Sequence, residues 1–402
     1  MSKSKIIHPR VVLASDLLSL LGDSMLKDLV RALQADKWVI KLHTVTVFKL
    51  ILYSLLDSER ISLRTMADQY TSIPFQTLEQ SVIGQSTAHS SIRDRLIGID
   101  VRFFKGIYDQ TLSMLSTHYG NNELSGQYNI KRYDSTMIAV FSHMLQGMQV
   151  GNTSRKKNQV KLTTELINDF EIRMRFFKDQ DHLGEETALK EMIQSQKHNA
   201  DSLIVFDRGL KSRQTFCELK DLKTQFVTRL NENSRYKLIQ PHAEVPSQLV
   251  NGLQFVQDSI VYLYGDGRKL VQEEFRLIEA QTQNGKKLFF LTNILFLDAQ
   301  TIAEVYRRRW DIEVFFRFLK QEMNLTHFVC NDLNAIQVMI YCILIAAMLV
   351  LVYKKQNNIK SYKIAKTRFF KELQAAITLE LIDTPLGIEQ LRRILKAKIK
   401  SP

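Results

Sequence analysis

Hydrophobic residues recur every three to four positions through the first 120 residues of the chain. The segments "LLSLLGDSMLKDLVRALQADKW" and "TVFKLILYSLLDSERISLRTMADQY" show this spacing, which is that of one face of an α-helix. Strand-like alternation is hard to find between them. The pattern therefore predicts a helical N-terminal domain over residues 1–120.

One N-terminal segment carries polar residues that bear on its role. In "STAHSSIRDRLIGI", residues 86–99, Ser and Thr precede an amphipathic stretch that contains Arg93 and Arg95. Ser and Thr are favoured helix N-caps, so a capped helix is expected here. It is either an ordinary helix of a bundle or the second helix of a helix-turn-helix.

Near Gly126 the pattern changes to that of strands. Residues 128–141, "YNIKRYDSTMIAVF", are rich in β-branched and aromatic residues, and "QVKLTTELI" and "EIRMRFF" follow as further strands. Helical and strand-like segments then alternate through "GEETALKEMIQSQKHN", "SLIVFDRGL", "KSRQTFCELKDL" and "QFVTRL". This alternation predicts an α/β domain in which a mixed sheet is flanked by helices.

Two later regions depart from the alternation. Residues 231–287 hold β-rich runs joined by "GDG", which predicts a hairpin within a β-rich insertion, and "KLFFLTNI" then returns to the core sheet. Residues 336–353, "IQVMIYCILIAAMLVLVY", are 18 residues with one glutamine, the lower limit for a membrane span. The central helix of a large domain is favoured instead, because there is one such segment and charged residues lie on both sides of it.

Residues 306–320, "YRRRWDIEVFFRFLK", combine a buried pattern with charge. In 312–319 six of eight residues are apolar, and the two polar ones, Glu313 and Arg317, are four apart. At roughly 100° per residue, Tyr306, Arg309, Glu313 and Lys320 fall within about 60° of one another on a helix. The pattern predicts a helix that is packed nearly all round except for one narrow charged window, with Asp298 or Thr301 as the N-cap of the segment that leads into it.

The composition is that of a folded, basic protein of more than one domain. The 402 residues are 45% hydrophobic and 24% charged, with a net charge of +13 that favours a polyanionic partner such as nucleic acid. Residues 354–402 carry 12 Lys and Arg against 4 Asp and Glu, which is +8 of that total. A merely soluble basic protein is the alternative explanation of this charge.

Two further features bear on the compartment. The three cysteines, Cys217, Cys330 and Cys342, form no CxxC pair and are expected to be free thiols in a reducing environment. Asp16 interrupts the apolar N-terminal stretch, so a signal peptide is not expected.

Three acidic residues far apart in the chain are candidates for metal-dependent chemistry. Cleavage of phosphodiesters by two metal ions needs about three carboxylates around cations roughly 3.5–4 Å apart. Asp134 lies in the strand segment "RYDST", Asp207 follows the strand "SLIVF", and Glu313 lies in the charged window. Each has an ordinary structural explanation as well: Asp134 and Asp207 as turn or cap residues, and Glu313 as a partner of the flanking arginines.

The combination resembles a known enzyme family. The spacing Tyr306-x₂-Arg309-x₃-Glu313-x₆-Lys320 is similar to the YREK signature of the insertion-sequence-four family of bacterial DDE transposases, and "YDST" and "DRG" look like its two aspartate motifs. The resemblance implies a ribonuclease H-like catalytic domain in which Asp134, Asp207 and Glu313 are catalytic and bind two Mg²⁺ ions, with Mn²⁺ as a substitute. It further implies that Tyr306, Arg309, Lys320, Arg317 and Arg208 contact DNA.

The same resemblance sets expectations for activity and partners. It implies cut-and-paste transposition at terminal inverted repeats, through a DNA hairpin, by a DNA-associated protein of the bacterial cytoplasm that acts as a homodimer on the element ends and target DNA. The alternative is a catalytically inactive DNA-binding protein derived from such an enzyme. Some family members stack a flipped base on a Trp in the β insertion; here Trp38 and Trp310 both lie outside it, so the stacking side chain must come from a set of aromatic residues, namely Tyr236, Phe255, Tyr262, Tyr264 and Phe275.

The expected domain organisation has five parts. They are a helical N-terminal DNA-binding domain (1–120), the first part of the catalytic core (125–230), the β-rich insertion (231–287), the second part of the core with the Glu313 helix (288–355) and a basic helical C-terminal region (356–402).

Overall fold

The computed structural model describes residues 12–383, except 81–84, 121–127, 140–147, 151–156, 168, 178–179, 183, 197, 200, 247 and 266–268. By packing, the chain forms two units, one of Met1–Tyr119 with Phe318–Pro402 and one of Gly120–Arg317. We call the first the helical unit and the second the sheet unit. The part of the predicted C-terminal region after residue 383 and the first 11 residues lie outside the described residues, and the five predicted domains stay predictions.

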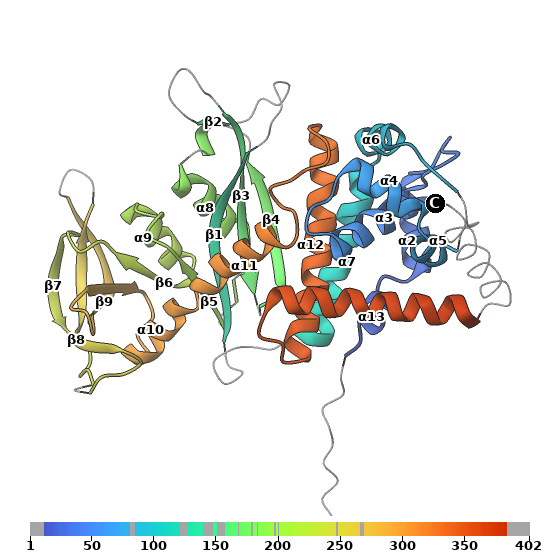
Figure 1. Ribbon diagram of the computed structural model, residues 1–402. Helices are drawn as coiled ribbons and strands as arrows, with labels where there is room; N and C mark the ends of the chain where they lie inside the picture. The colour runs from blue at the N-terminus through green and yellow to red at the C-terminus, as the bar shows by residue number, and fades with distance from the viewer. Residues whose placement is uncertain are drawn as a thin grey trace, which may run out of the picture. The chain divides into compact units, whose positions relative to one another are not determined.

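The sheet unit combines a large sheet with helices on its faces (Figure 1). Its strands are β1 (Asn129–Ala139), β2 (Met148–Val150), β3 (Lys157–Ile167), β4 (Glu171–Phe177), β5 (Ser202–Phe206), β6 (Gln225–Leu230), β7 (Tyr236–Pro241), β8 (Leu253–Tyr264), β9 (Leu270–Thr282) and β10 (Lys287–Thr292). Its helices are η1 (Gln180–His182), α8 (Glu185–Gln194), α9 (Arg213–Asp221), α10 (Ala299–Arg307) and the first part of α11 (Trp310–Gln321).

These strands form one mixed sheet, which confirms the predicted α/β class. Their order is β2-β3-β1-β5-β6-β10-β9-β8-β7, and β4 pairs with β3 outside this path. β1 runs parallel to β5 and β5 runs parallel to β6, while β3 and β10 pair antiparallel with β1 and β6. The three central strands therefore point their C-terminal ends toward the same edge of the sheet.

Alternation along the strands divides the unit's core between the two faces of the sheet. On one face Tyr133 and Phe206 pack in a cluster with residues of α8 and α9. On the other face Ile130 and Val205 pack in a cluster with residues of α10. The apolar strands are buried on both sides, as the runs "SLIVF" and "QFVTRL" suggest.

Residues 231–287 are rich in strands, as their sequence pattern predicts; they contain β7, β8 and β9, and these strands extend the same sheet. β9 pairs antiparallel with β10, β8 with β9 and β7 with β8. Gly265 directly follows β8, and the rest of the "GDG" hairpin loop lies outside the described residues. The segment is thus continuous with the core sheet through β10.

The helical unit is built from helices of the N-terminal segment and the C-terminal part of the chain. They are α1 (Ala14–Ser19), α2 (Asp23–Leu33), α3 (Thr44–Asp57), α4 (Leu63–Thr71), α5 (Ile73–Leu78), α6 (His89–Gly98), α7 (Val101–Tyr119), α12 (Leu333–Gln356) and α13 (Tyr362–Asp383). The predicted helical character of residues 1–120 is confirmed for the part that the structure describes. Helix α11 runs on into this unit with its last four residues.

Helix α12 is the core of the helical unit. Among the described residues it is the one helix long and apolar enough to cross a membrane, but 89% of its most apolar window is buried inside the protein. It packs against α3, α7 and α13 (Figure 1). This burial supports the interpretation of 336–353 as a central domain helix and is consistent with a soluble protein.

Helix α6 differs from the expectation at its first residue. Its N-cap is Ala88, without a side-chain capping bond, so the prediction of a Ser or Thr cap is wrong. Arg93 is exposed, whereas Arg95 points inward and bonds to the loop that precedes α3. The inward Arg95 therefore has a structural role within the unit.

The three cysteines are free thiols, as predicted, and all of them are buried. Cys342 lies on α12 with no exposed surface, and burial raises the pKa of its thiol well above the usual value. Cys330 belongs to the same unit, while Cys217 lies on α9 of the sheet unit, where burial also raises its pKa.

Candidate active site

Asp134 and Asp207 lie on neighbouring parallel strands. The pairing of β1 with β5 runs from Asn129 with Ser202 to Tyr133 with Phe206, so the next step of the register sets the two aspartates side by side. Neighbouring strands are about 4.8 Å apart. By alternation both aspartates face the α10 side of the sheet, and both are half-buried.

Tyr306 joins this pair from helix α10. Its side chain is 8% exposed, and its hydroxyl donates to Oδ1 of Asp207 at 3.4 Å. Burial and the nearby Asp207 charge raise the pKa of the Tyr306 hydroxyl, which therefore remains a protonated donor at neutral pH.

Arg309 and Glu313 form the next link of the site. Nη1 of Arg309 lies 2.6 Å from Oε1 of Glu313, and the guanidinium carbon lies 5.7 Å from the centre of the Tyr306 ring. Burial disfavours the charge on Arg309, but the nearby Tyr306, Asp207 and Glu313 outweigh it and raise the pKa of Arg309. Four of the seven site residues predicted from sequence in this unit are therefore linked in a chain from Asp207 to Glu313.

The helix that carries the charged window is interrupted, contrary to the prediction of one continuous helix over 306–320. Helix α10 is capped by Asp298, as one predicted alternative states, and ends at Arg307, while α11 begins at Trp310. The N–H groups of Asp311 and Ile312 bond three residues back rather than four, at 3.1 and 3.3 Å.

A buried arginine from β1 explains this break. Nε of Arg132 donates to the carbonyl oxygen of Arg308 at 2.9 Å, and its Nη2 lies 3.2 Å from Asp311. The Arg308 carbonyl would accept a helical bond from Ile312 in a continuous helix, and here a side chain takes that place. The break sets Arg309 and Glu313 on a different axis from Tyr306.

Arg229 belongs to the same group, although the sequence did not single it out. The parallel pairing of Val205 with Val227, continued by two residues, sets Arg229 beside Asp207 on the same face of the sheet. Its guanidinium carbon lies 5.7 Å from the centre of the Tyr306 ring, which is also the distance of the Arg309 guanidinium carbon from this ring. Within the described part of the chain its buried Nε has no hydrogen-bond partner. The strand segment "QFVTRL" indicated a strand, but only the register reveals this neighbour.

Three further residues are predicted to contact DNA, namely Arg208, Arg317 and Lys320. Arg208 is exposed, and its Nη1 donates to Asn231 at 3.2 Å, while its Nε lies 3.9 Å from Asp207. Arg317 is exposed on α11 at the end of the sheet unit. Lys320, in the last turn of α11, belongs to the helical unit.

An apolar pocket of about 210 Å³ adjoins Tyr306 within the sheet unit. Among its lining residues are Phe255, Phe290, Arg229 and Arg307. Of the aromatic residues proposed for base stacking, Phe255 is therefore the one that lines this pocket. Phe275 is buried in the cluster on the other face of the sheet.

The chemistry of the donor atoms fits a hard divalent cation, but the carboxylates are not yet gathered around one. Among the described residues no group of three or more His, Cys, Asp or Glu is placed to hold a metal ion. Asp134 and Asp207 are neighbours, whereas Glu313 is held in its ion pair with Arg309. Carboxylate oxygens are the ligands that Mg²⁺ prefers, so Glu313 would have to exchange Arg309 for the ion.

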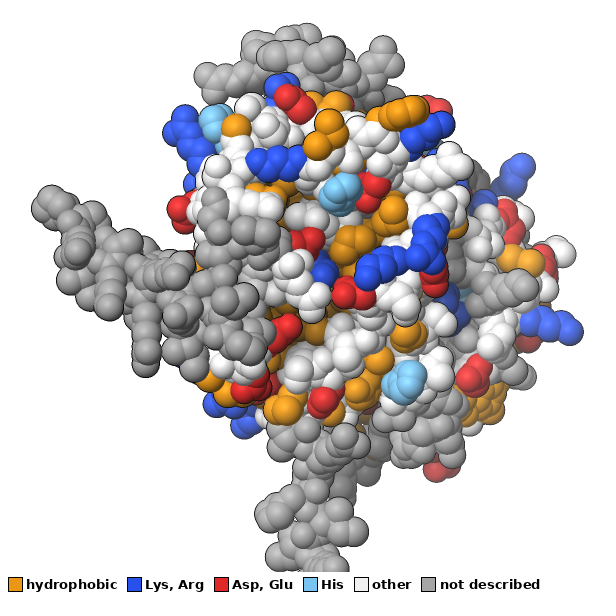
Figure 2. Space-filling model, turned by 90° about the vertical axis from the view of Figure 1, so that its right-hand side faces the viewer, with side chains coloured by type: hydrophobic (Ala, Val, Ile, Leu, Met, Phe, Trp, Pro, Cys, Tyr) orange, Lys and Arg blue, Asp and Glu red, His pale blue; other side chains and the backbone are white. Residues whose placement is uncertain are grey.

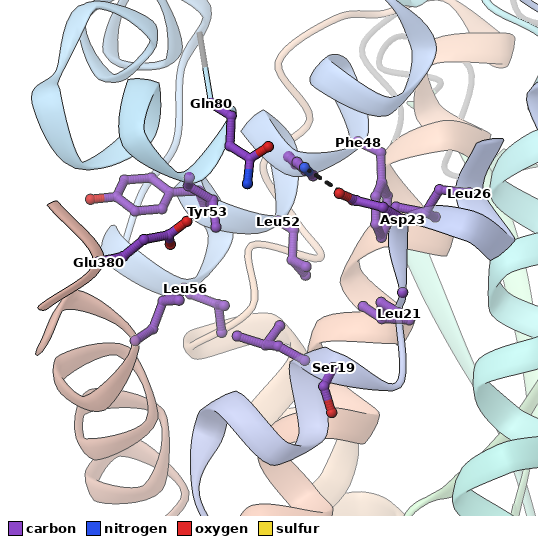
Figure 3. A pocket seen from close by; sticks show the side chains of 15 residues that line it. Ser19, Leu21, Asp23, Leu26, Phe48, Leu52, Tyr53, Leu56, Gln80 and Glu380 are labelled. Atoms are coloured by element: carbon purple, nitrogen blue, oxygen red, sulfur yellow. Dashed lines mark ion pairs between the residues drawn. The ribbon is translucent and has the colours of Figure 1, made fainter. Parts of the chain in front are cut away.

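The helical unit has a pocket of its own, of about 280 Å³ (Figure 3). Leu21, Leu26 and Phe48 form part of its apolar wall, and Asp23 pairs with Lys49 at 3.3 Å at its rim. On the face that looks to the right in Figure 1, hydrophobic side chains are exposed between charged side chains of both signs (Figure 2). This pocket lacks the cluster of carboxylates and arginines that marks the sheet unit.

Three proteins named as transposases are similar to this chain. The chain is 26% identical to y4zB of Sinorhizobium fredii over 39% of this chain and 43% of that protein. It is 27% identical to the transposase for insertion sequence element IS5377 of Geobacillus stearothermophilus over 44% and 47%. It is 23% identical to the transposase for element IS4SA of Synechocystis over 73% and 77%. The match thus spans less than half the length of the first two relatives.

A family model described as "Transposase DDE domain" matches residues 134–349, from the first candidate aspartate to the middle of α12. This range is more than half of the chain, and it includes Asp134, Asp207, Tyr306, Arg309 and Glu313. The match agrees with the resemblance seen in the sequence motifs. The chain therefore belongs to the transposase DDE domain family.

Proposed function

We propose that this transposase cuts DNA at the terminal inverted repeats of a bacterial insertion sequence and joins the ends to target DNA, by metal-dependent cut-and-paste transposition. One observation carries the proposal: Asp134 and Asp207 share a face of the sheet, and Tyr306, Arg309 and Glu313 are linked to Asp207 there. The mixed sheet supports a ribonuclease H-like core.

Asp134, Asp207 and Glu313 are the proposed ligands of two divalent cations, Mg²⁺ or Mn²⁺. When bound, such a pair activates the attacking oxygen and stabilises the leaving oxygen of a phosphodiester. The hydroxyl of Tyr306 holds the Asp207 carboxylate in place through its hydrogen bond. Arg309 keeps Glu313 oriented in the free protein, and it would be free to meet DNA if Glu313 bound a cation instead.

Arg309 and the neighbouring Arg229 are proposed to bind the scissile phosphate. A guanidinium group binds phosphate through two parallel hydrogen bonds, and both groups already lie at the same tyrosine ring. Arg208, Arg317 and Lys320 are proposed as further contacts to the DNA backbone. The DNA hairpin intermediate, the homodimer and the bacterial cytoplasm remain expectations from the family resemblance, and Phe255 is the preferred candidate for base stacking among the five aromatic residues.

The alternative is a DNA-binding protein that has lost catalysis. The presence of all three carboxylates together with the tyrosine and arginines of the signature favours the enzyme, because a protein that only binds DNA has no need of acidic groups beside phosphates. Both functions predict DNA binding, so cleavage is the property that separates them.

The test uses the full chain and a linear DNA that includes both sequences flanking its coding region. Asp134→Asn, Asp207→Asn and Glu313→Gln are expected to keep DNA binding and to lose Mg²⁺-dependent strand cleavage by at least about a thousandfold, because each removes a metal ligand. Asp221→Asn, at the exposed end of α9, is the matched control and should cleave like the wild type. Undiminished cleavage by any of the three variants would remove that residue from the mechanism.

A further inference from the structure

The loop between α2 and α3, residues 34–43, presents two large hydrophobic side chains to solvent. Trp38 is 89% exposed and Ile40 is 96% exposed, the two highest values among the exposed large hydrophobic residues of the described chain. Single exposed hydrophobic side chains are common on proteins. Two that are almost fully exposed, two positions apart on one loop, are a stronger indication of a binding surface.

The backbone of this loop is strained. Gln34, Trp38 and Leu42 have φ values of 48°, 68° and 58°, in the left-handed region that large side chains rarely adopt. Such conformations persist only where the surrounding structure enforces them, and they collect at functional sites. A surface loop without a role could relax to an ordinary conformation.

Arg95 of α6 and the first residue of α3, Thr44, fix the ends of this loop. Arg95 donates from Nε to the Leu42 carbonyl at 3.0 Å and from Nη2 to the Ala35 carbonyl at 3.3 Å and to Asp36 Oδ1 at 3.0 Å. The same carboxylate accepts from the backbone N–H of Thr44 at 2.8 Å. Both ends of the loop are therefore fixed, and the tip that bears Trp38 and Ile40 is held away from the helices.

The charge around the tip is positive. Lys37, Lys41 and His43 are exposed, and Nζ of Lys41 also donates to the Ser86 carbonyl oxygen. The one acidic residue of the loop, Asp36, bonds to Arg95 and Thr44, and its Oδ2 lies 3.5 Å from Nδ1 of His43. Nζ of Lys37 lies 5.8 Å from the centre of the Trp38 ring. An aromatic ring with cations beside it suits a nucleic acid, because bases can stack on the ring and phosphates can pair with the cations.

We propose that residues 34–43 form a DNA contact in which Trp38, aided by Ile40, stacks on or inserts between bases while Lys37 and Lys41 contact phosphates. Apolar wedges of this kind insert between base steps in proteins that bend DNA. Arg95 is a positioning residue, since it fixes the loop without reaching the DNA itself. The inference rests on the proposed function for its choice of partner, and it names a point of the helical unit that meets that partner.

The experiment measures the fluorescence emission of Trp38. Because Trp38 and Trp310 are the only tryptophans, Trp310→Phe leaves Trp38 as the sole source of tryptophan emission. This variant is titrated, without divalent cations, with a duplex cut from the DNA that flanks the coding region and with a scrambled duplex of equal length. Stacking on bases should quench the emission strongly on the flanking duplex.

Affinity measurements complete the test. Trp38→Ala should weaken binding of the flanking duplex about tenfold, the effect of one stacking side chain, and Lys37→Gln should lower its salt dependence. Arg95→Gln should weaken DNA binding by about as much as Trp38→Ala does. In the free protein, the emission of Trp38 should remain that of a solvent-exposed tryptophan. Leu379→Ala, which truncates a 63% exposed leucine on α13 of the same unit, is the control and should bind normally.

Two outcomes would overturn the inference. One is unchanged Trp38 emission together with an affinity of Trp38→Ala within twofold of the wild type. The other is that Trp38→Ala abolishes self-association of the protein without changing its affinity for DNA, which would assign the loop to a second copy of the chain. Because binding is read without divalent cations, quenching in Trp310→Phe together with a wild type that binds DNA but never cleaves it would refute the proposed function and leave this inference standing.

Discussion

Arg132 lies in the middle of β1, and its guanidinium group is fully buried. It donates to the carbonyl oxygens of Ile130, at 3.1 Å, and of Arg308, at 2.9 Å, and it faces Asp311. One side chain thus ties the strand of Asp134 to the turn that places Arg309 and Glu313. The motif "RYDST" drew attention to Asp134, but Arg132, two positions before it, determines where Arg309 and Glu313 lie.

Arg132→Met should destabilise the protein by about 3 kcal/mol, since it removes the buried guanidinium group that bonds to two carbonyl oxygens and pairs with Asp311. Urea unfolding measures this loss. Arg307→Met removes an arginine whose side chain is 70% exposed, so it should change the free energy of unfolding by about 0.5 kcal/mol or less. Equal effects of the two substitutions would show that Arg132 does not hold the turn.

At the scale of elements, periodicity located the helices and strands well and their interruptions poorly. The strands "SLIVF", "QFVTRL" and "KLFFLTNI" and the hairpin of β8 and β9 follow from local pattern, and so does the Asp298 cap. The break between α10 and α11 does not, because its cause is a side chain that lies 176 residues earlier in the chain. The neighbourhood of Arg229 and Asp207 likewise depends on strand register, which one sequence does not reveal.

Helix α13 provides a prediction about pH. Lys366 on this helix is 5% exposed, and its Nζ donates to the carbonyl oxygens of Ser58, at 3.0 Å, and Glu322, at 2.5 Å. Burial is the main cause that lowers the pKa of Lys366 from 10.5 to about 8. Between these two values the unfolded chain binds the proton and the folded chain does not, so this group makes the protein more stable as pH rises from 8 to 10.5.

The measurement compares the wild type with Lys366→Met in urea at pH 7 and pH 10. At pH 7 the folded wild type carries the buried charge, whose cost fades as the folded protein loses that proton. The stability of the wild type relative to the variant should therefore rise by roughly 2–3 kcal/mol from pH 7 to pH 10. Lys363→Met, at an exposed lysine on the same helix, should show no such rise. A constant difference between wild type and Lys366→Met would mean that Lys366 titrates normally.

At the scale of the whole molecule, the net charge of +13 indicated a polyanionic partner, but it did not indicate where that partner binds. The structure separates cations with a structural task, such as Arg95, Arg132 and Lys366, from those beside the candidate carboxylates. Membership of the transposase family then follows from the match over residues 134–349. The sequence motifs foresaw that family, because its signature residues have a fixed spacing that needs no knowledge of the fold.

The proposed phosphate ligands should be visible in the salt dependence of DNA binding. Arg309→Ala, Lys320→Ala and Arg229→Ala should each weaken binding to the flanking duplex and reduce the slope of log affinity against log salt by about 0.9 for each phosphate that the variant no longer neutralises. Lys286→Ala, in the exposed turn between β9 and β10, should leave the slope unchanged. An unaltered slope for the three site variants would contradict their role as phosphate ligands.

Two of the three buried thiols, Cys342 and Cys217, can report separately on the opening of the two units. Cys342 is sealed inside the helical unit and Cys217 lies within the sheet unit, so an alkylating reagent can reach either sulfur only when its surroundings open. The rate at which each sulfur is modified therefore times the opening of one unit separately from the other. Equal modification rates would mean that the two units unfold together as one cooperative unit. Unequal rates would identify the unit that opens more readily.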